Sequence, residues 1–107
     1  MITIFTIPKS FSDTHINIIQ TNAIKSWLEL GSGIEVFLLG DDQGVSKKAE
    51  EFGIRHIHGV SCNEYSTPLL DSAFKLAKES TENEYLMYIN ADIILLKDFF
   101  NIFSYIN

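Results

Sequence analysis

The residues best suited to chemistry are Asn90 and Asp92, which follow a strand-like run, Tyr-Leu-Met-Tyr-Ile, at positions 85–89. A carboxylate at the end of a strand can hold a hard cation such as Mg²⁺ or Mn²⁺ through oxygen. The Asn90 amide can add a neutral oxygen ligand or a hydrogen bond to a ribose. These two residues are therefore candidates for a divalent metal site, with Asp92 as the main ligand and Asn90 assisting it. The alternative interpretation is structural: Asn90 would only form a turn, and the Asp92 carboxylate would only cap the next segment.

Two further groups of polar side chains could do chemistry. Asp41 and Asp42 follow the strand-like run 34–39, where they fit either a solvated loop pair or, for Asp41, a contact to a nucleotide. His56 and His58 share one face if their strand is regular, which permits metal chelation. No third ligand is evident from the sequence, so metal binding by the two histidines is the weaker interpretation.

Alternating strand-like and helix-like segments position these residues. Apolar and β-branched runs predict strands at 2–7, 34–39, 54–58 and 85–89, and helical spacing with capping signals predicts helices at 14–30, 46–52, 68–79 and 99–106. This order predicts an α/β, Rossmann-like, mostly parallel sheet with helices on both faces. Nothing divides residues 1–107 into two domains.

The predicted strand order places the candidate residues around one crevice. The common order for such a half-sheet is 3-2-1-4, so the first and fourth strands are neighbours. Open sheets bind ligands outside the carboxyl ends of their strands, where the strand order reverses. Pro8 and Asp92 are therefore expected to flank this crevice, with Asp41 on its near side.

Composition and missing motifs exclude several classes of protein. The chain has eight basic and 14 acidic residues, scattered along its length, and a net charge of −6, so no nucleic-acid partner is expected. No apolar run approaches about 20 residues, so no transmembrane segment is predicted, and the single cysteine suits a cytoplasmic location. No glycine-rich turn follows the first strand, which argues against a dinucleotide fingerprint and a P-loop. A receiver domain is excluded because its acidic residues would follow the first strand.

The strand-end motif resembles the Asp-x-Asp region of the GT-A glycosyltransferases, which transfer a sugar from a nucleotide-diphosphate donor. Residues 6–9, 20–27 and 67–70 are similar to one glycosyltransferase-like subgroup. The resemblance covers nearly the whole chain, but only the N-terminal, nucleotide-binding half of that fold. It implies that the acceptor site lies beyond Asn107, so transfer is expected to need a longer chain.

The resemblance also implies a set of ligand contacts. Mn²⁺ or Mg²⁺ would bind at Asp92 with help from Asn90, although Asn90 is uncharged where the motif has its first Asp, which predicts a lower affinity. The expected contacts to a nucleotide-diphosphate sugar come from Thr6 and Pro8 beside the base, Asp41 at the base or ribose, Thr67 near the nucleotide, and Asn90.

Two alternatives to an enzyme stay open. The first is a truncated, non-catalytic module that binds nucleotide or forms a homo-oligomer through an exposed C-terminal sheet edge and the Phe99-Phe100-Phe103 surface. The second is a plain α/β scaffold in which Asp92 is only a turn residue.

Overall fold

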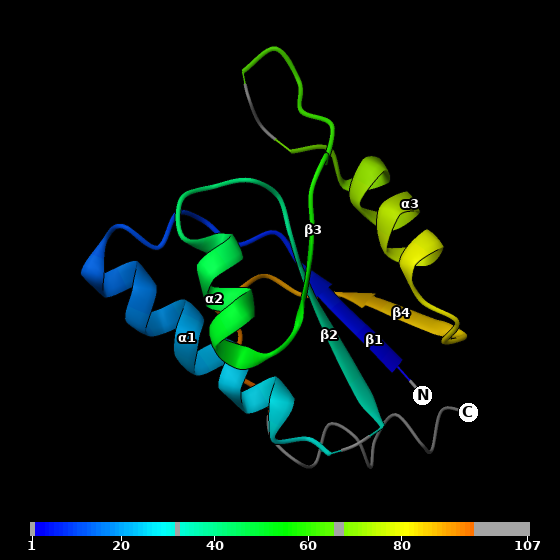
Figure 1. Ribbon diagram of the computed structural model, residues 1–107, viewed down its shortest axis with the longest axis horizontal. Helices are drawn as coiled ribbons and strands as arrows, with labels where there is room; N and C mark the ends of the chain where they lie inside the picture. The colour runs from blue at the N-terminus through cyan, green and yellow to red at the C-terminus, as the bar shows by residue number, and fades with distance from the viewer. Residues whose placement is uncertain (1, 32, 66–67, 96–107) are drawn as a thin grey trace.

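The computed structural model describes residues 2–31, 33–65 and 68–95. The elements in chain order are β1 (Ile2–Thr6), α1 (Thr14–Leu28), β2 (Ile34–Leu39), α2 (Val45–Phe52), β3 (Arg55–Ile57), α3 (Leu70–Ser80) and β4 (Tyr85–Tyr88), as Figure 1 shows. The predicted alternation of strands and helices is confirmed. The helix predicted after Asp98 and the Phe99-Phe100-Phe103 surface lie outside the described residues.

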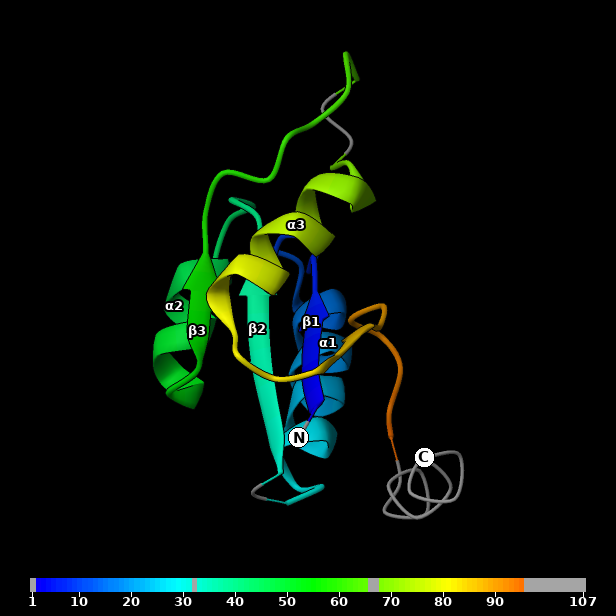
Figure 2. The ribbon, with the colours of Figure 1, turned by 90° about the vertical axis from the view of Figure 1, so that its right-hand side faces the viewer.

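The four strands form one parallel sheet in the order β3-β2-β1-β4, as predicted. β1 is central, and Ile4 pairs with Val36 of β2 on one side and with Met87 of β4 on the other. Figure 2 shows β3, β2 and β1 side by side. The sequence order of the strands therefore reverses between β1 and β4, where the crevice was expected.

Both faces of the sheet are covered by helices, with α1 and α2 on one side and α3 on the other (Figure 1). All five residues of β1 are buried, and their side chains alternate between the two faces. Ile2 and Ile4 belong to the core cluster under α1 and α2, whereas Phe5 belongs to the cluster under α3. Because both faces of this strand are covered, it has no solvent-exposed side, and its two polar residues, Thr3 and Thr6, are buried with the apolar ones.

Helix α1 has 15 residues, and its N-cap residue is Asp13. The Asp13 carboxylate accepts a hydrogen bond from the backbone amide of Ile16 at 3.0 Å. Trp27 and Ile24 are completely buried against the sheet. This apolar anchor sets the position of both ends of the helix relative to β1 and β4.

The start of α3 differs from the prediction. The helix begins at Leu70 rather than at Pro68, and its cap residue Leu69 has an extended backbone. Pro68 instead forms an antiparallel bridge with Cys62, and the Leu69 amide donates to the Ser61 carbonyl at 2.8 Å. Proline suits an extended backbone as well as a first helical turn, and pairing with the preceding loop selects the extended form.

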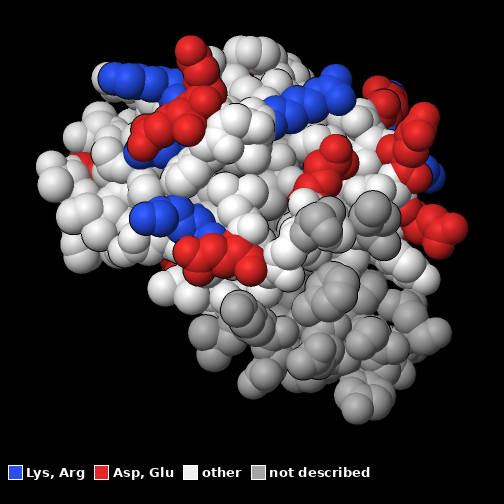
Figure 3. All heavy atoms as spheres, turned by 60° about the horizontal axis from the view of Figure 1, so that its bottom comes forward, with Lys and Arg blue, Asp and Glu red and all other residues white. Residues whose placement is uncertain are grey.

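The surface carries charges of both signs. On the face shown in Figure 3, lysine and arginine side chains are interspersed with aspartate and glutamate side chains. In the part of the chain that the structure describes, no helix has the length and apolar character needed to cross a bilayer.

Candidate functional site

A cleft of about 350 Å³ lies at the carboxyl ends of β1 and β4. It is bounded by the segment after β1, the first half of α1 and the turn after β4, and it is lined by Ile7, Lys9, Ile16, Ile19, Gln20, Tyr88, Asn90, Ala91 and Asp92. A larger hollow of about 440 Å³ lies at the opposite, amino ends of β2 and β3. We favour the first cleft because open parallel sheets bind their ligands at the carboxyl ends of the strands.

The turn after β4 presents Asn90 and Asp92 to this cleft. The Ile89 amide donates to the Phe5 carbonyl at 3.2 Å, which extends the contact with β1 by one residue beyond β4. The Ile93 amide then donates to the Asn90 carbonyl at 3.2 Å, which closes the turn. Ala91 is buried within the turn, whereas Asn90 and Asp92 are exposed.

Helix α1 holds the chain immediately after this turn. The Trp27 indole N–H donates to the Ile93 carbonyl at 2.8 Å, and the Ser26 hydroxyl oxygen accepts from the Leu95 amide at 3.0 Å. These contacts join residues far apart in sequence, so the position of Asp92 is set by α1 as well as by the sheet.

The opposite wall of the cleft is fixed by Gln20. Its side-chain oxygen accepts from the Lys9 amide at 2.7 Å, and its side-chain nitrogen donates to the Lys9 carbonyl at 3.0 Å. Gln20 is only 4% exposed, whereas the Lys9 side chain is exposed. Neither residue was predicted as a site residue. Gln20 could have been noticed in the sequence, because it is a polar residue at the helical spacing of the apolar Ile16, Ala23 and Trp27.

The pKa of Tyr88 reflects the electrostatic environment of the cleft. Burial raises the pKa of its phenol above the ordinary value, and the nearby Asp92 carboxylate raises it further. The negative charge of Asp92 disfavours ionisation of the phenol to a phenolate. Tyr88 therefore stays a neutral hydrogen-bond donor at physiological pH. The cleft thus combines the carboxylate of Asp92, the ammonium group of Lys9 and a phenol that can donate a hydrogen bond.

The other predicted nucleotide contacts lie outside the lining of this cleft. Thr6 and Pro8 are fully buried, and the Thr6 hydroxyl has no hydrogen-bond partner among the described residues. Asp41 is exposed beyond the end of β2, and Thr67 lies outside the described residues. The roles expected of these four residues stay predictions.

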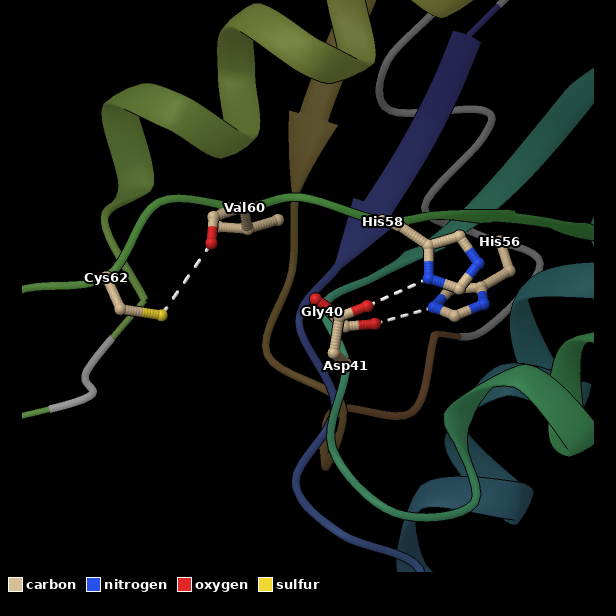
Figure 4. Close-up of polar contacts among 6 residues, drawn as sticks. All are labelled: Gly40, Asp41, His56, His58, Val60 and Cys62. Carbon is tan, nitrogen blue, oxygen red and sulfur yellow. Dashed lines mark hydrogen bonds and ion pairs between the residues drawn. The ribbon is translucent and has the colours of Figure 1, made fainter.

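Asp41 instead belongs to a second polar cluster, with His56 and His58 (Figure 4). Asp41 Oδ1 lies 2.9 Å from Nδ1 of His58, and this hydrogen bond is the main cause of the lowered pKa of the Asp41 carboxyl. The sequence showed the two histidines but not the third side chain. Parallel pairing of β3 with β2 brings Asp41 to them, because Leu39 pairs with Ile57.

Comparison of the chain with protein-family models, with curated proteins and with solved structures found no match. The resemblance to the glycosyltransferases therefore depends on the residues described above.

Proposed function

We propose that this domain binds a nucleotide-diphosphate sugar in the cleft between β1 and β4, through a divalent cation held by Asp92 and Asn90. The observation that carries this proposal is the convergence of Asn90, Asp92 and Lys9 in one cleft at the carboxyl ends of two neighbouring parallel strands. The cleft volume of about 350 Å³ is within the usual range of small-molecule sites, about 300–1,000 Å³.

The side chains available fit a hard cation. A carboxylate and an amide oxygen are the donors that Mg²⁺ and Mn²⁺ prefer, and both side chains are exposed, which leaves room for water and phosphate oxygens as further ligands. Neither side chain makes a hydrogen bond or ion pair within the described part of the chain. Asp92 is therefore not engaged in capping its own turn, which favours the metal over the plain turn residue.

The cleft can also stabilise a diphosphate leaving group. A bound cation would neutralise the charge that develops on the diphosphate as the sugar is transferred. Lys9 adds a positive charge on the opposite wall, and the protonated Tyr88 hydroxyl can donate a hydrogen bond to a phosphate or sugar oxygen. Each of these groups favours a diphosphate over an uncharged ligand.

Calorimetric titration with a panel of nucleotide-diphosphate sugars, in Mn²⁺ or in EDTA, tests the proposal. We expect Mn²⁺-dependent binding that weakens at least tenfold in Asp92→Asn. Glu82→Gln is the matched control, because this exposed carboxylate lies before β4, at the opposite end of the strand. A folded protein that binds none of the ligands, or binds them equally in EDTA and in Asp92→Asn, would contradict the proposal.

The charge on the opposite wall is tested separately. Lys9→Met should weaken nucleotide-sugar binding about tenfold or more while leaving Mn²⁺ binding unchanged, because Lys9 contacts the anion and not the metal. Lys47→Met, on the exposed side of α2, is the control. Assays of hydrolysis and transfer on the same samples separate an enzyme from a module that only binds.

A further inference from the structure

The second polar cluster lies at the carboxyl ends of β2 and β3, separate from the cleft between β1 and β4. Asp41 follows β2, His56 is the central residue of β3, and His58 follows β3 directly. None of the three lines the cleft described above. Whatever this cluster binds is therefore held independently of Asn90 and Asp92.

We propose that Asp41, His56 and His58 form a zinc-binding site. Each side chain offers one ligand atom, and these three atoms all lie within 4.8 Å of one another, the one such group of three found among the described residues. The two imidazole rings lie with their centroids 4.0 Å apart. Figure 4 shows one nitrogen of each ring directed toward the Gly40–Asp41 segment, so the donor atoms converge on one side of the cluster.

The donor set selects the metal. Two imidazole nitrogens with one carboxylate oxygen suit zinc and its neighbours, whereas Mg²⁺ and Ca²⁺ prefer oxygen ligands throughout. Three protein ligands leave one position of a tetrahedral zinc site for water. Solvent can reach that position, because the side chains of His58 and Asp41 are 69% and 60% exposed.

The ligand-free hydrogen bonds hold the donor atoms near one another. Nδ1 of His58 donates to the Asp41 carboxylate at 2.9 Å, and Nε2 of His56 donates to the Gly40 carbonyl at 2.5 Å. For zinc to bind at these two nitrogens, each neutral imidazole would carry its single proton on its other ring nitrogen, which is the opposite tautomer to the one in these hydrogen bonds. In His56 that other nitrogen is Nδ1, which has no hydrogen-bond partner among the described residues, so moving the proton to Nδ1 breaks no hydrogen bond at that atom.

Zinc at this place would tether the loop after β2 to β3. β3 has three residues and is an edge strand that pairs only with β2 in the described sheet, so it gains most from an added link. A metal that binds the folded state and not the unfolded chain raises stability in proportion to the logarithm of its free concentration. The melting temperature should therefore rise with added zinc.

Titration of EDTA-treated, tag-free protein with Zn²⁺, in competition with a chromogenic chelator, tests the proposal. We expect one zinc ion per chain, and a loss of at least tenfold in affinity in both His58→Ala and Asp41→Asn, whose exposed side chains can be changed without disturbing the core. Co²⁺ should give the visible absorption of a tetrahedral site, and this band should disappear in His58→Ala.

Matched controls exclude binding elsewhere. His15→Ala removes an exposed histidine of α1, Asp42→Asn removes the neighbouring carboxylate, and Cys62→Ser removes the single thiol. All three should keep the wild-type zinc affinity. No zinc binding by the wild type, or equal binding in His58→Ala and Asp41→Asn, would overturn the proposal.

The two proposed sites can fail separately. Asp92→Asn should weaken Mn²⁺-dependent nucleotide-sugar binding and leave zinc binding unchanged, whereas His58→Ala should weaken zinc binding and leave nucleotide-sugar binding unchanged. Loss of both activities in either variant, with the fold intact by circular dichroism, would show that the cluster is not an independent zinc site.

Discussion

The side-chain amide of Gln20 holds the backbone of Lys9 by two hydrogen bonds, at 2.7 Å to the amide and 3.0 Å to the carbonyl. The contact fixes the chain just after β1 to helix α1. The same helix, through Trp27 and Ser26, holds the segment after β4. Both walls of the candidate cleft are thus attached to the same helix.

Replacing Gln20 by Ala should lower the free energy of unfolding by about 2 kcal/mol or more, because two main-chain groups of Lys9 lose their partner. Asn22→Ala, on the exposed side of the same helix, should change it by less than about 0.5 kcal/mol. Chemical denaturation followed by circular dichroism measures both values. Equal stabilities of the two variants would show that the Gln20 contact contributes little.

Replacing Ser26 by Ala should release the segment that follows Asp92. The Leu95 amide loses its acceptor, so its hydrogen exchange should speed up about fivefold to tenfold, the effect of one lost hydrogen bond. Native-state exchange measured by NMR tests this, with Ser46→Ala of α2 as the control. Unchanged protection of Leu95 would mean that Trp27 alone holds the segment.

Replacing Asn90 by Asp should tighten Mn²⁺ binding about tenfold or more, because a second carboxylate then faces the cation. Asn22→Asp adds the same charge outside the cleft and should leave the affinity nearly unchanged. Calorimetric titration with Mn²⁺ measures the difference. If Asn90→Asp binds Mn²⁺ more weakly than the wild type, Asn90 does not face the bound cation, and the prediction is wrong.

The pKa of Tyr88 gives a pH-dependent test of the cleft. A raised pKa favours the neutral phenol in the folded state, so its contribution to stability is complete below the ordinary value of 10.0 and is lost as the pH rises through the folded-state value. Asp92→Asn should lower the Tyr88 pKa only in part, because burial is the larger cause. Tyrosinate absorbance, assigned by difference from Tyr88→Phe, measures the shift. If Tyr88 titrates identically in the wild type and in Asp92→Asn, the Asp92 charge does not affect the Tyr88 phenol, which contradicts this prediction.

The sequence by itself determined the architecture. Apolar and β-branched runs, helical spacing and capping signals are local, and their alternation, together with the common strand order of such half-sheets, was enough to predict a parallel sheet in the order 3-2-1-4. Because that order makes β1 and β4 neighbours, the place of the cleft and the exposure of Asn90 and Asp92 within it followed from the same pattern. Each of these features depends on residues a few positions apart or on a general rule of topology.

Only the tertiary structure decided which side chains meet. The contact of Gln20 with Lys9, the grouping of Asp41 with His56 and His58, and the late start of α3 depend on strand register and on the path of loops. Those are set by the packing of the whole chain, because a side chain finds its partner only after distant segments have been fixed against the core. Local sequence patterns carry no record of these distances.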